Sequence, residues 1–218
     1  MSLELHYIDG SPFARIIRIL AREHRVAMRE TEIVEFPPSD SFLAINPLGQ
    51  VPVLMAADGQ AFFPTRIAIA ALLERLSTPS KEVATAIART SERDKDEQDL
   101  AVILAMGDAL AAHHYARWAG IGQVDENELG FDPAQRNMTR ALRTLDWLAK
   151  RMQDGRFQSD LISVQDIALA SFILWTESRG PIEWRGRPQI ENLIGRLENR
   201  VSFVATKPRP NPLKMAPA

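Results

Sequence analysis

Two hydroxyl side chains stand where the sequence predicts that helices begin, and such positions can hold an anion. Ser11 precedes Pro12 and an apolar helical pattern, and Thr65 precedes a second such pattern. Serine and threonine are favoured helix N-caps, and proline is favoured at the first helical position. The first amides of a helix lack partners within it and its dipole is positive there, so a hydroxyl at this point can help to stabilise negative charge. The alternative for Ser11 is that it only caps its helix.

A third candidate is the stretch of residues 46–54, which joins a turn signal to a short apolar strand. Proline has no N–H, so Pro52 is tolerated only at the first residue of a strand, at an edge or at a bulge. A cis X-Pro bond costs only about 0.5–1 kcal/mol relative to trans. A cis Val51–Pro52 bond would leave the Val51 N–H and C=O outside the sheet, where an extended peptide could pair with them. The alternative is an ordinary proline that opens a strand.

Strand and helix signals alternate around these candidates as far as residue 76. Strands are predicted at residues 3–8, 29–36, 53–55 and 61–63, and helices at 12–25 and 66–76. Residues 40–45 form at most a short helix, and Asp58-Gly59 is a hairpin turn signal. This order predicts a small mixed sheet covered by helices.

The second part of the chain reads as helix throughout. After a linker at 77–80, helices are predicted at residues 83–119, 133–154, 164–178 and 189–201. We therefore expect a first domain at residues 1–78 and an all-helical second domain at 84–206, followed by a Pro-rich tail at 207–218 without regular structure. Ser163 and Asp166 form a capping-box pattern, and the helix that follows is apolar nearly all round. That helix should be the buried centre of the second domain.

Composition narrows the classes of protein to consider. The chain of 218 residues is 45% hydrophobic and 25% charged, as ordinary soluble domains are. A net charge of −2 gives no electrostatic reason to expect a nucleic acid or an anionic membrane as a partner. With no cysteine, disulfides, thiolate metal sites and cysteine nucleophiles are impossible. No targeting segment and no membrane span are expected, and the chain is most simply cytoplasmic.

Two further patterns contain side chains that can bind a metal or a polyanion. His113 and His114 could suggest a metal, but adjacent helical residues point about 100° apart and no third ligand is in sight. No metal site is therefore expected. Arg136, Arg140 and Arg143 form a helical stripe, and the acidic residues near it favour a solvated face over a polyanion site.

Taken together, these features resemble the glutathione S-transferase family over nearly the whole chain. The most specific segments are Ser11-Pro12-Phe13-Ala14-Arg15, residues 46–54 and residues 163–166, and the segment 181–188 looks like bacterial members. The resemblance implies a thioredoxin-like N-terminal domain that binds the tripeptide glutathione. It also implies an all-helical C-terminal domain that supplies the pocket for a second substrate.

The chemistry implied by the resemblance is the stabilisation of a sulfur anion. A free thiol has a pKa near 8.5, and only its thiolate is a good nucleophile. Ser11 stands in the place of the serine or cysteine that stabilises the thiolate in serine- and cysteine-type members. Lowering a thiol pKa by about 2 units requires roughly 2.7 kcal/mol, within reach of one or two charge-assisted hydrogen bonds. Tyr7 is the runner-up, because other classes use a tyrosine near that point.

The resemblance also implies two sets of binding residues. The Val51 backbone would pair with the cysteinyl unit of glutathione, Gln50 would lie near its glycine end, and Thr65, as an N-cap, would hold the γ-glutamyl carboxylate. The whole predicted glutathione site is Ser11, Phe13, Gln50, Val51, Pro52, Thr65 and Arg66. The predicted acceptor-substrate pocket is Met106, Leu110, His114 and Tyr115, for which the alternative is a place in the core or in an interface.

One position departs from the family pattern. An acidic residue commonly precedes the Ser or Thr at position 65, whereas this chain has Pro64. This change removes an acceptor for the ammonium group of glutathione and one backbone donor. A carboxylate from the long helix of a partner subunit could substitute: Asp94, Asp96, Glu97 or Asp99.

The resemblance thus implies a homodimeric glutathione transferase with a role in detoxification, and we expect it in the cytoplasm. Glutathione would be its co-substrate, and its thiol would attack a small electrophile. The alternative is a non-catalytic scaffold of the same fold that binds another protein, and Pro64 is the feature that favours it. Storage of apolar ligands is a third hypothesis.

Overall fold

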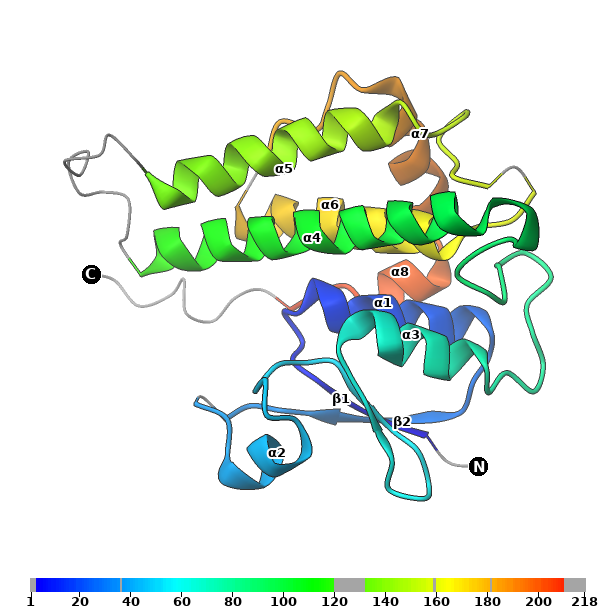
Figure 1. Cartoon of the computed structure of the whole chain (residues 1–218), viewed down its shortest axis with the longest axis vertical. Helices are drawn as coiled ribbons and strands as arrows, with labels where there is room; N and C mark the ends of the chain where they lie inside the picture. The colour runs from blue at the N-terminus through cyan, green and yellow to red at the C-terminus, as the bar shows by residue number, and fades with distance from the viewer. Residues whose placement is uncertain (1–2, 36, 120–131, 159, 181, 210–218) are drawn as a thin grey trace. The chain divides into compact units, whose positions relative to one another are not determined.

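The computed structural model describes residues 3–35, 37–119, 132–158, 160–180 and 182–209. Its contacts divide the chain into two compact units, one made of Met1–Ile87 with Asn199–Ala218 and the other of Ala88–Glu198. Figure 1 shows the elements of both units.

The first unit contains a mixed, four-stranded sheet in the order β2-β1-β3-β4. Its strands are β1 (Leu3–Tyr7), β2 (Met28–Glu32), β3 (Val53–Met55) and β4 (Ala61–Phe62). β2 is parallel to β1, whereas β3 is antiparallel to both β1 and β4. The predicted hairpin turn is confirmed, because Gly59 has a φ of 86° and Ala56 N–H bonds to Gln60 C=O at 2.9 Å. The predicted mixed sheet is therefore present.

The helices of the first unit are α1 (Pro12–Glu23), α2 (Asp40–Ile45), α3 (Thr65–Leu73) and the short α8 (Val201–Ala205). α1 and α3 lie side by side over one face of the sheet (Figure 1). Fully buried apolar side chains on these elements form the core: Leu5, Ile16, Ile17, Leu20, Leu54, Ile69 and Leu72. Burial of such side chains supplies most of the stability of a small domain. The core therefore fixes the start of α1 and the start of α3 against the same sheet.

The second unit is helical, with α4 (Arg93–Trp118), α5 (Pro133–Ala149), α6 (Val164–Arg179) and α7 (Pro188–Leu197). α4 and α5 run antiparallel (Figure 1). α6 is buried along most of its length, as the sequence predicts, and Phe172 is fully buried. A Cβ atom at Gly107 of α4 would lie 2.3 Å from the Phe172 ring. Glycine at this position thus allows α4 to pack closely on the central helix.

The predicted helix at 83–119 begins later than expected, at Arg93, after a 3-10 turn at Thr90–Glu92. The reason is a side chain that competes for a backbone donor. Asp96 Oδ2 accepts the Arg89 N–H at 2.9 Å and Arg89 Nε at 3.0 Å, so this amide does not bond to a carbonyl four residues back. Val83 and Ile87 are buried outside any α-helix.

Other predicted boundaries were also wrong. The helix predicted at 133–154 ends at Ala149, where the Arg151 and Met152 N–H groups bond to C=O groups three residues back; the chain then turns at Asp154 and Gly155. The helix predicted at 189–201 ends at Leu197, and α8 follows as a separate helix that contacts α1. The strand predicted at 29–36 ends at Glu32, and its last residue, Phe36, lies outside the described residues. Of the predicted tail, residues 207–209 have no regular structure, and residues 210–218 are outside the described part of the chain.

Candidate functional site

Ser11 caps α1 with its hydroxyl oxygen, and the cap does not use its O–H donor. It closes a turn with Ser11 N–H bonded to Ile8 C=O at 2.9 Å, and its Oγ accepts the Ala14 N–H at 3.2 Å. The residue is half-buried. A hydroxyl has one donor and two acceptor sites, and none of the described residues accepts the Ser11 O–H. The group can therefore donate to a ligand without giving up its role as a cap.

A buried cation lies one helical turn after Ser11. Arg15 is 4% exposed, and its Nη2 donates to the Phe203 C=O at 3.0 Å. Burial, with repulsion from Arg18, lowers the pKa of Arg15 to about 10. The guanidinium is still charged at neutral pH, so it adds positive charge to the part of α1 that follows the serine.

Tyr7, the alternative thiol partner, is less suited to the task. Burial raises the pKa of its phenol, although the Arg18 guanidinium opposes this rise. Arg18 also covers one face of the ring at 4.4 Å from its centroid. A phenol with a raised pKa is a weaker acid, and thus a weaker donor to a thiolate.

The turn before β3 is held by a side chain whose role the sequence analysis missed. Asn46 is buried, its Nδ2 donates to Gln50 C=O at 2.7 Å, and its Oδ1 accepts the Leu48 N–H at 3.0 Å. Gly49 has a φ of 61°, where glycine is favoured. Asn in an Asn-Pro turn signal is the feature that could have revealed this, since Asn side chains bond locally to the backbone. These hydrogen bonds fix the position of Val51, which follows the turn.

Val51 and Pro52 lie just before the paired part of the sheet. The Val51–Pro52 and Phe63–Pro64 peptide bonds are cis. The ladder between β1 and β3 begins with His6 opposite Val53. Among the described residues, no backbone group bonds to the Val51 N–H or C=O. Both groups can thus pair with an added extended peptide.

The start of α3 differs from the prediction. Pro64, not Thr65, is the N-cap: its C=O accepts from Ile67 N–H at 2.9 Å and Ala68 N–H at 3.1 Å. Thr65 is the first residue of the helix and is buried, and its hydroxyl forms no capping hydrogen bond. The prediction of a Thr65 cap was therefore wrong. The helix start has no side-chain cap, which leaves backbone amides as its means of holding an anion.

The sheet register brings the predicted glutathione residues to one edge. Ser11 follows the end of β1, and Val51 precedes the start of β3, which lies opposite that end. β4 pairs Phe62 with Leu54, so Thr65, which follows β4, is at the same edge. Phe13 and Arg66 are in the first turns of α1 and α3, and Gln50 is exposed in the turn before β3. The residues from three separate segments are thus gathered in the first unit.

The four residues predicted to form the acceptor pocket are not gathered in the same way. Met106 and Leu110 are buried among the core residues. The His114 ring lies 5.3 Å from that of Trp175 and 5.6 Å from that of Tyr115. Tyr115 is 62% exposed. A shared cavity lined by all four is therefore not supported, and an acceptor role for His114 and Tyr115 stays a prediction.

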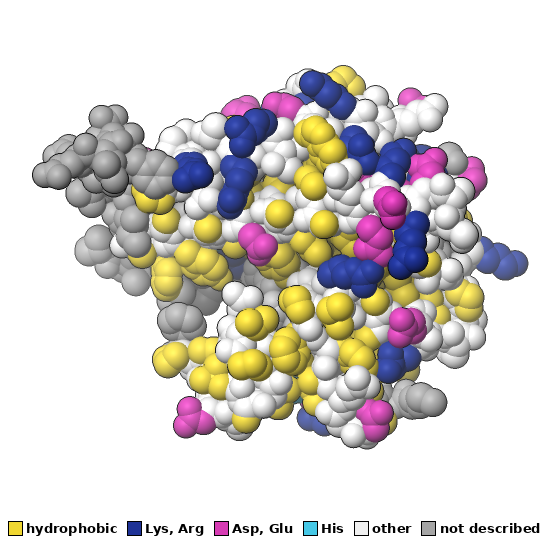
Figure 2. All heavy atoms as spheres, in the orientation of Figure 1, with side chains coloured by type: hydrophobic (Ala, Val, Ile, Leu, Met, Phe, Trp, Pro, Cys, Tyr) yellow, Lys and Arg dark blue, Asp and Glu magenta, His cyan; other side chains and the backbone are white. Residues whose placement is uncertain are grey.

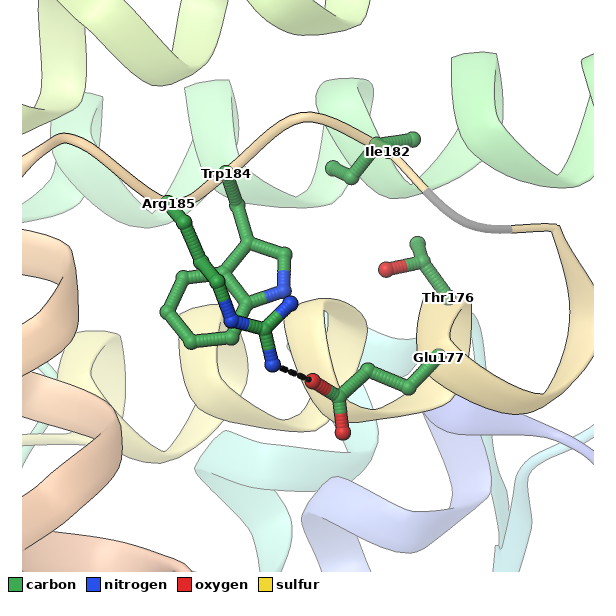
Figure 3. Close-up of a pocket in the computed structure, with 5 residues that line it drawn as sticks. All are labelled: Thr176, Glu177, Ile182, Trp184 and Arg185. Atoms are coloured by element: carbon green, nitrogen blue, oxygen red, sulfur yellow. Dashed lines mark hydrogen bonds and ion pairs between the residues drawn. The ribbon is translucent and has the colours of Figure 1, made fainter.

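A small cavity of about 220 Å³ lies elsewhere in the second unit (Figure 3). It is lined by Thr176 and Glu177 of α6 and by Ile182, Trp184 and Arg185 of the segment that follows. Arg185 lies over the Trp184 ring at 4.3 Å and pairs with Glu177 at 2.9 Å. The ion pair thus fills the polar side of the cavity, and none of the predicted acceptor residues lines it.

Two of the carboxylates considered as substitutes for the missing acid are already used. Asp96 and Asp99 are both buried and pair with Arg89 and Arg151, respectively. Burial raises the pKa of Asp99 against the opposing effect of Arg151. They cannot serve a ligand of a partner subunit without breaking these pairs, so that prediction was wrong for them. Asp94 is exposed and Glu97 is half-buried.

The remaining polar features of the described residues show structural roles. His113 Nδ1 lies 2.8 Å from Ala134 C=O, and no cluster of three or more possible metal ligands occurs in the described ranges. Cationic side chains spread over the face of α5 that Figure 2 displays. Arg140 there donates to Asn137, and Arg136 and Arg143 are exposed, as on a solvated face. Within the same ranges, no helix is both long and apolar enough to cross a bilayer.

A thioredoxin-like unit with a mixed sheet, followed by a helical unit, is the fold of the glutathione S-transferases. Residues 5–80 match the family described as "Glutathione S-transferase, N-terminal domain". The chain is 27% identical over 200 residues to "Uncharacterized GST-like protein YibF" of Escherichia coli K12, covering 91% of this chain and 95% of that one. The chain is therefore similar to glutathione S-transferases: its N-terminal residues match that family's domain, and its fold is the fold of these proteins.

Solved structures agree with this fold. A glutathione S-transferase from Methylobacillus flagellatus with glutathione bound has a TM-score of 0.78 and 22% identity, covering 95% of this chain and all (100%) of that one. One from Methylobacterium radiotolerans, in complex with glutathione sulfonate, has a TM-score of 0.80 and 21% identity, covering 97% of each chain.

Proposed function

We propose that this protein is a glutathione transferase in which Ser11 activates the thiol of glutathione for attack on a small electrophile. The observation that carries the proposal is the state of the Ser11 hydroxyl. It accepts from Ala14 N–H, belongs to the end of a helix with a positive dipole, and keeps its own O–H for a ligand. The glutathione bound in several solved relatives supports the choice of ligand.

The same edge of the sheet offers partners for the rest of the tripeptide. The free N–H and C=O groups of Val51 would pair with the cysteinyl backbone. The first amides of α3 and the Arg66 guanidinium would hold the γ-glutamyl carboxylate, and Phe13, Gln50 and Pro52 would complete the proposed site. These partners orient the ligand, so that its sulfur faces Ser11.

The chemical step itself needs little from the protein beyond the thiolate. The Ser11 O–H would donate to the sulfur anion, and the amides and dipole of α1 would add to its stabilisation. The bound thiol loses its proton to solvent. The sulfur then forms a bond to the electrophilic carbon as the leaving group departs with its electron pair.

Calorimetry with reduced glutathione, followed by turnover of a small aryl halide, tests this function. The wild-type protein should bind glutathione and catalyse the reaction, whereas Ser11→Ala should bind it and turn over about 100-fold more slowly, as when one anion-stabilising donor is removed. No binding at millimolar glutathione would count against the proposal. An unchanged rate in Ser11→Ala would count against the role of the serine.

A non-catalytic scaffold is the second candidate, because Pro64 offers no acceptor for the glutathione ammonium. A stoichiometric protein partner, together with a site that takes up no glutathione, would favour it. A homodimer in the cytoplasm is part of the first proposal, and light scattering of the purified protein tests the dimer.

A further inference from the structure

Residues 203–209, here called the C-terminal segment, form hydrogen bonds with one residue before Ser11 in the sequence and one after it. After Ser11, Arg15 of α1 donates to Phe203 C=O at 3.0 Å and to Thr206 Oγ1 at 3.4 Å. The Arg15 guanidinium also lies 5.6 Å from the centroid of the Phe203 ring. This contact is buried, so it fixes the first turns of α1 to the segment.

Before Ser11, the contact is made by Asp9, which lies within the turn that the Ser11 N–H closes. Its Oδ2 accepts the backbone N–H of Arg209 at 2.7 Å and lies 3.3 Å from Arg209 Nε. Arg18 Nη1 lies 3.7 Å from its other oxygen. The Asp9 side chain is only 16% exposed. A carboxylate held by two arginines and a backbone amide immobilises the turn that carries it.

The same turn contains a glycine. Gly10 separates Asp9 from Ser11 and has more backbone freedom than any other residue. We infer that the C-terminal segment is a positioning element for Ser11, with Arg209 holding the turn through Asp9 and Phe203 holding α1 through Arg15. The inference rests on the proposed function, in which the place of the hydroxyl decides how well it meets the sulfur.

Substitution of Asp9 distinguishes two effects on the pKa of the bound thiol: the position of Ser11 and the charge of the carboxylate. A negative charge beside the site disfavours a thiolate, so its removal by Asp9→Asn should lower the pKa of the bound thiol if only the electric field matters. If the carboxylate instead positions Ser11, its removal should raise that pKa, because the serine then donates less well. The two accounts predict opposite signs.

The experiment is a pH titration of bound glutathione thiolate, by ultraviolet absorbance, in Asp9→Asn, Arg209→Gln and the double variant. We expect each single change to raise the pKa of the bound thiol by about half a unit, or about threefold in thiolate fraction, with little change in KM for glutathione. The double variant should match Asp9→Asn, because in this account the Arg209 side chain acts on the turn through Asp9. Asp9→Glu should keep the wild-type pKa.

Arg200→Gln is the matched control. Arg200 adjoins the same segment but pairs with Glu23 and Glu82, both at 2.8 Å, at the other end of α1. This change should lower thermal stability and leave the thiol pKa unaltered. A lower pKa in Asp9→Asn, with cancellation in the double variant, would overturn the inference, and so would an equal rise in Arg200→Gln.

Amide hydrogen exchange separates this inference from the proposed function. Without glutathione, the amides of Ser11 and Ala14 should exchange several-fold faster in Asp9→Asn than in the wild type. Unchanged exchange would overturn the inference even in an active enzyme. A wild-type protein that forms no thiolate would refute the proposed function, and faster exchange in the variant would still support the anchoring of the turn.

Discussion

Ser11 and Ser163 both cap helices in this protein, and they differ in what surrounds them. Ser11 and Ser163 each accept the amide three residues on, at 3.2 and 3.0 Å. Ser163 is fully buried, and the Asp166 carboxylate accepts the Ser163 backbone N–H at 3.1 Å. At the corresponding position after Ser11 stands Ala14, which has no polar side chain, and Ser11 is half-buried.

The difference separates a cap that serves the fold from one that can serve a ligand. Asp166 also accepts the Phe157 N–H at 3.0 Å and lies 3.3 Å from Arg196 Nη2, so the α6 cap belongs to a buried network. The Ser163 cap thus takes part in hydrogen bonds that hold the second unit together. At Ser11 the corresponding capacity is left for solvent or for a bound anion.

The largest expected effect on stability comes from removal of Asp166, which completes the capping box at the start of α6. Asp166→Ala would leave two buried amides and Arg196 without their shared acceptor, and we expect a loss of about 3–5 kcal/mol in the free energy of unfolding. Denaturant unfolding measures it. Asp166→Asn, which keeps an acceptor oxygen, should lose less. A loss below about 1 kcal/mol for Asp166→Ala would show that the network is not structural.

A direct comparison of the two serines should give a smaller effect. Ser163→Ala removes a buried cap, and we expect about 1–2 kcal/mol of destabilisation; Ser11→Ala removes a half-buried one and should cost less than about 1 kcal/mol. Thermal and denaturant unfolding of both variants test this order. If Ser11→Ala destabilises the protein as much as Ser163→Ala does, the contrast between the two caps fails.

Acid should act on the two units in opposite senses. Burial alone would raise the pKa of Glu23, but hydrogen bonds from Arg200 and Ser202 leave it below its ordinary 4.5. The stability that Glu23 contributes is therefore present above pH 4.5 and lost as the pH falls through its lower folded value. For Asp99, burial raises the pKa above 3.8, so its contribution is present below that pH and lost as the pH rises through the folded value.

Amide exchange as a function of pH tests this contrast. We expect α1 to lose protection on acidification before α4 does. Glu23→Gln should make the protection of α1 less dependent on pH below 4.5. Protection in α1 that is equally dependent on pH in Glu23→Gln would contradict the assignment.

The start of α3 provides the mildest test. Pro64 gives this helix no side-chain cap and no acidic group. Pro64→Glu should tighten glutathione binding about threefold, as expected for an exposed ion pair with its ammonium. Calorimetry measures the change, with Pro64→Gln as the uncharged control. Equal affinity in the two variants would show that the ammonium lies elsewhere.

Local patterns were predictable from the sequence, because their signals lie within a few residues. The Ser11 cap and the Ser163–Asp166 capping box are of this kind, and the mixed sheet followed from its alternating signals. The choice of Pro64 over Thr65 as N-cap was not predictable, since it depends on the backbone path out of β4.

Long-range pairings were also beyond the sequence analysis. Asp99 looks like a surface carboxylate on a long helix, yet it pairs with Arg151 and is buried. The contact between Asp9 and Arg209 joins the two ends of the chain, and no periodic pattern marks it. Such pairs are set by tertiary packing rather than by local preference.

The most direct measurement is the titration of glutathione thiolate bound to the wild-type protein and to Ser11→Ala. We predict that the pKa of the bound thiol lies about 2 units below its free value near 8.5, and that most of this shift disappears in Ser11→Ala. The same thiol pKa in both proteins, with glutathione bound to each, would contradict the claim that the Ser11 hydroxyl at the start of α1 activates the thiol.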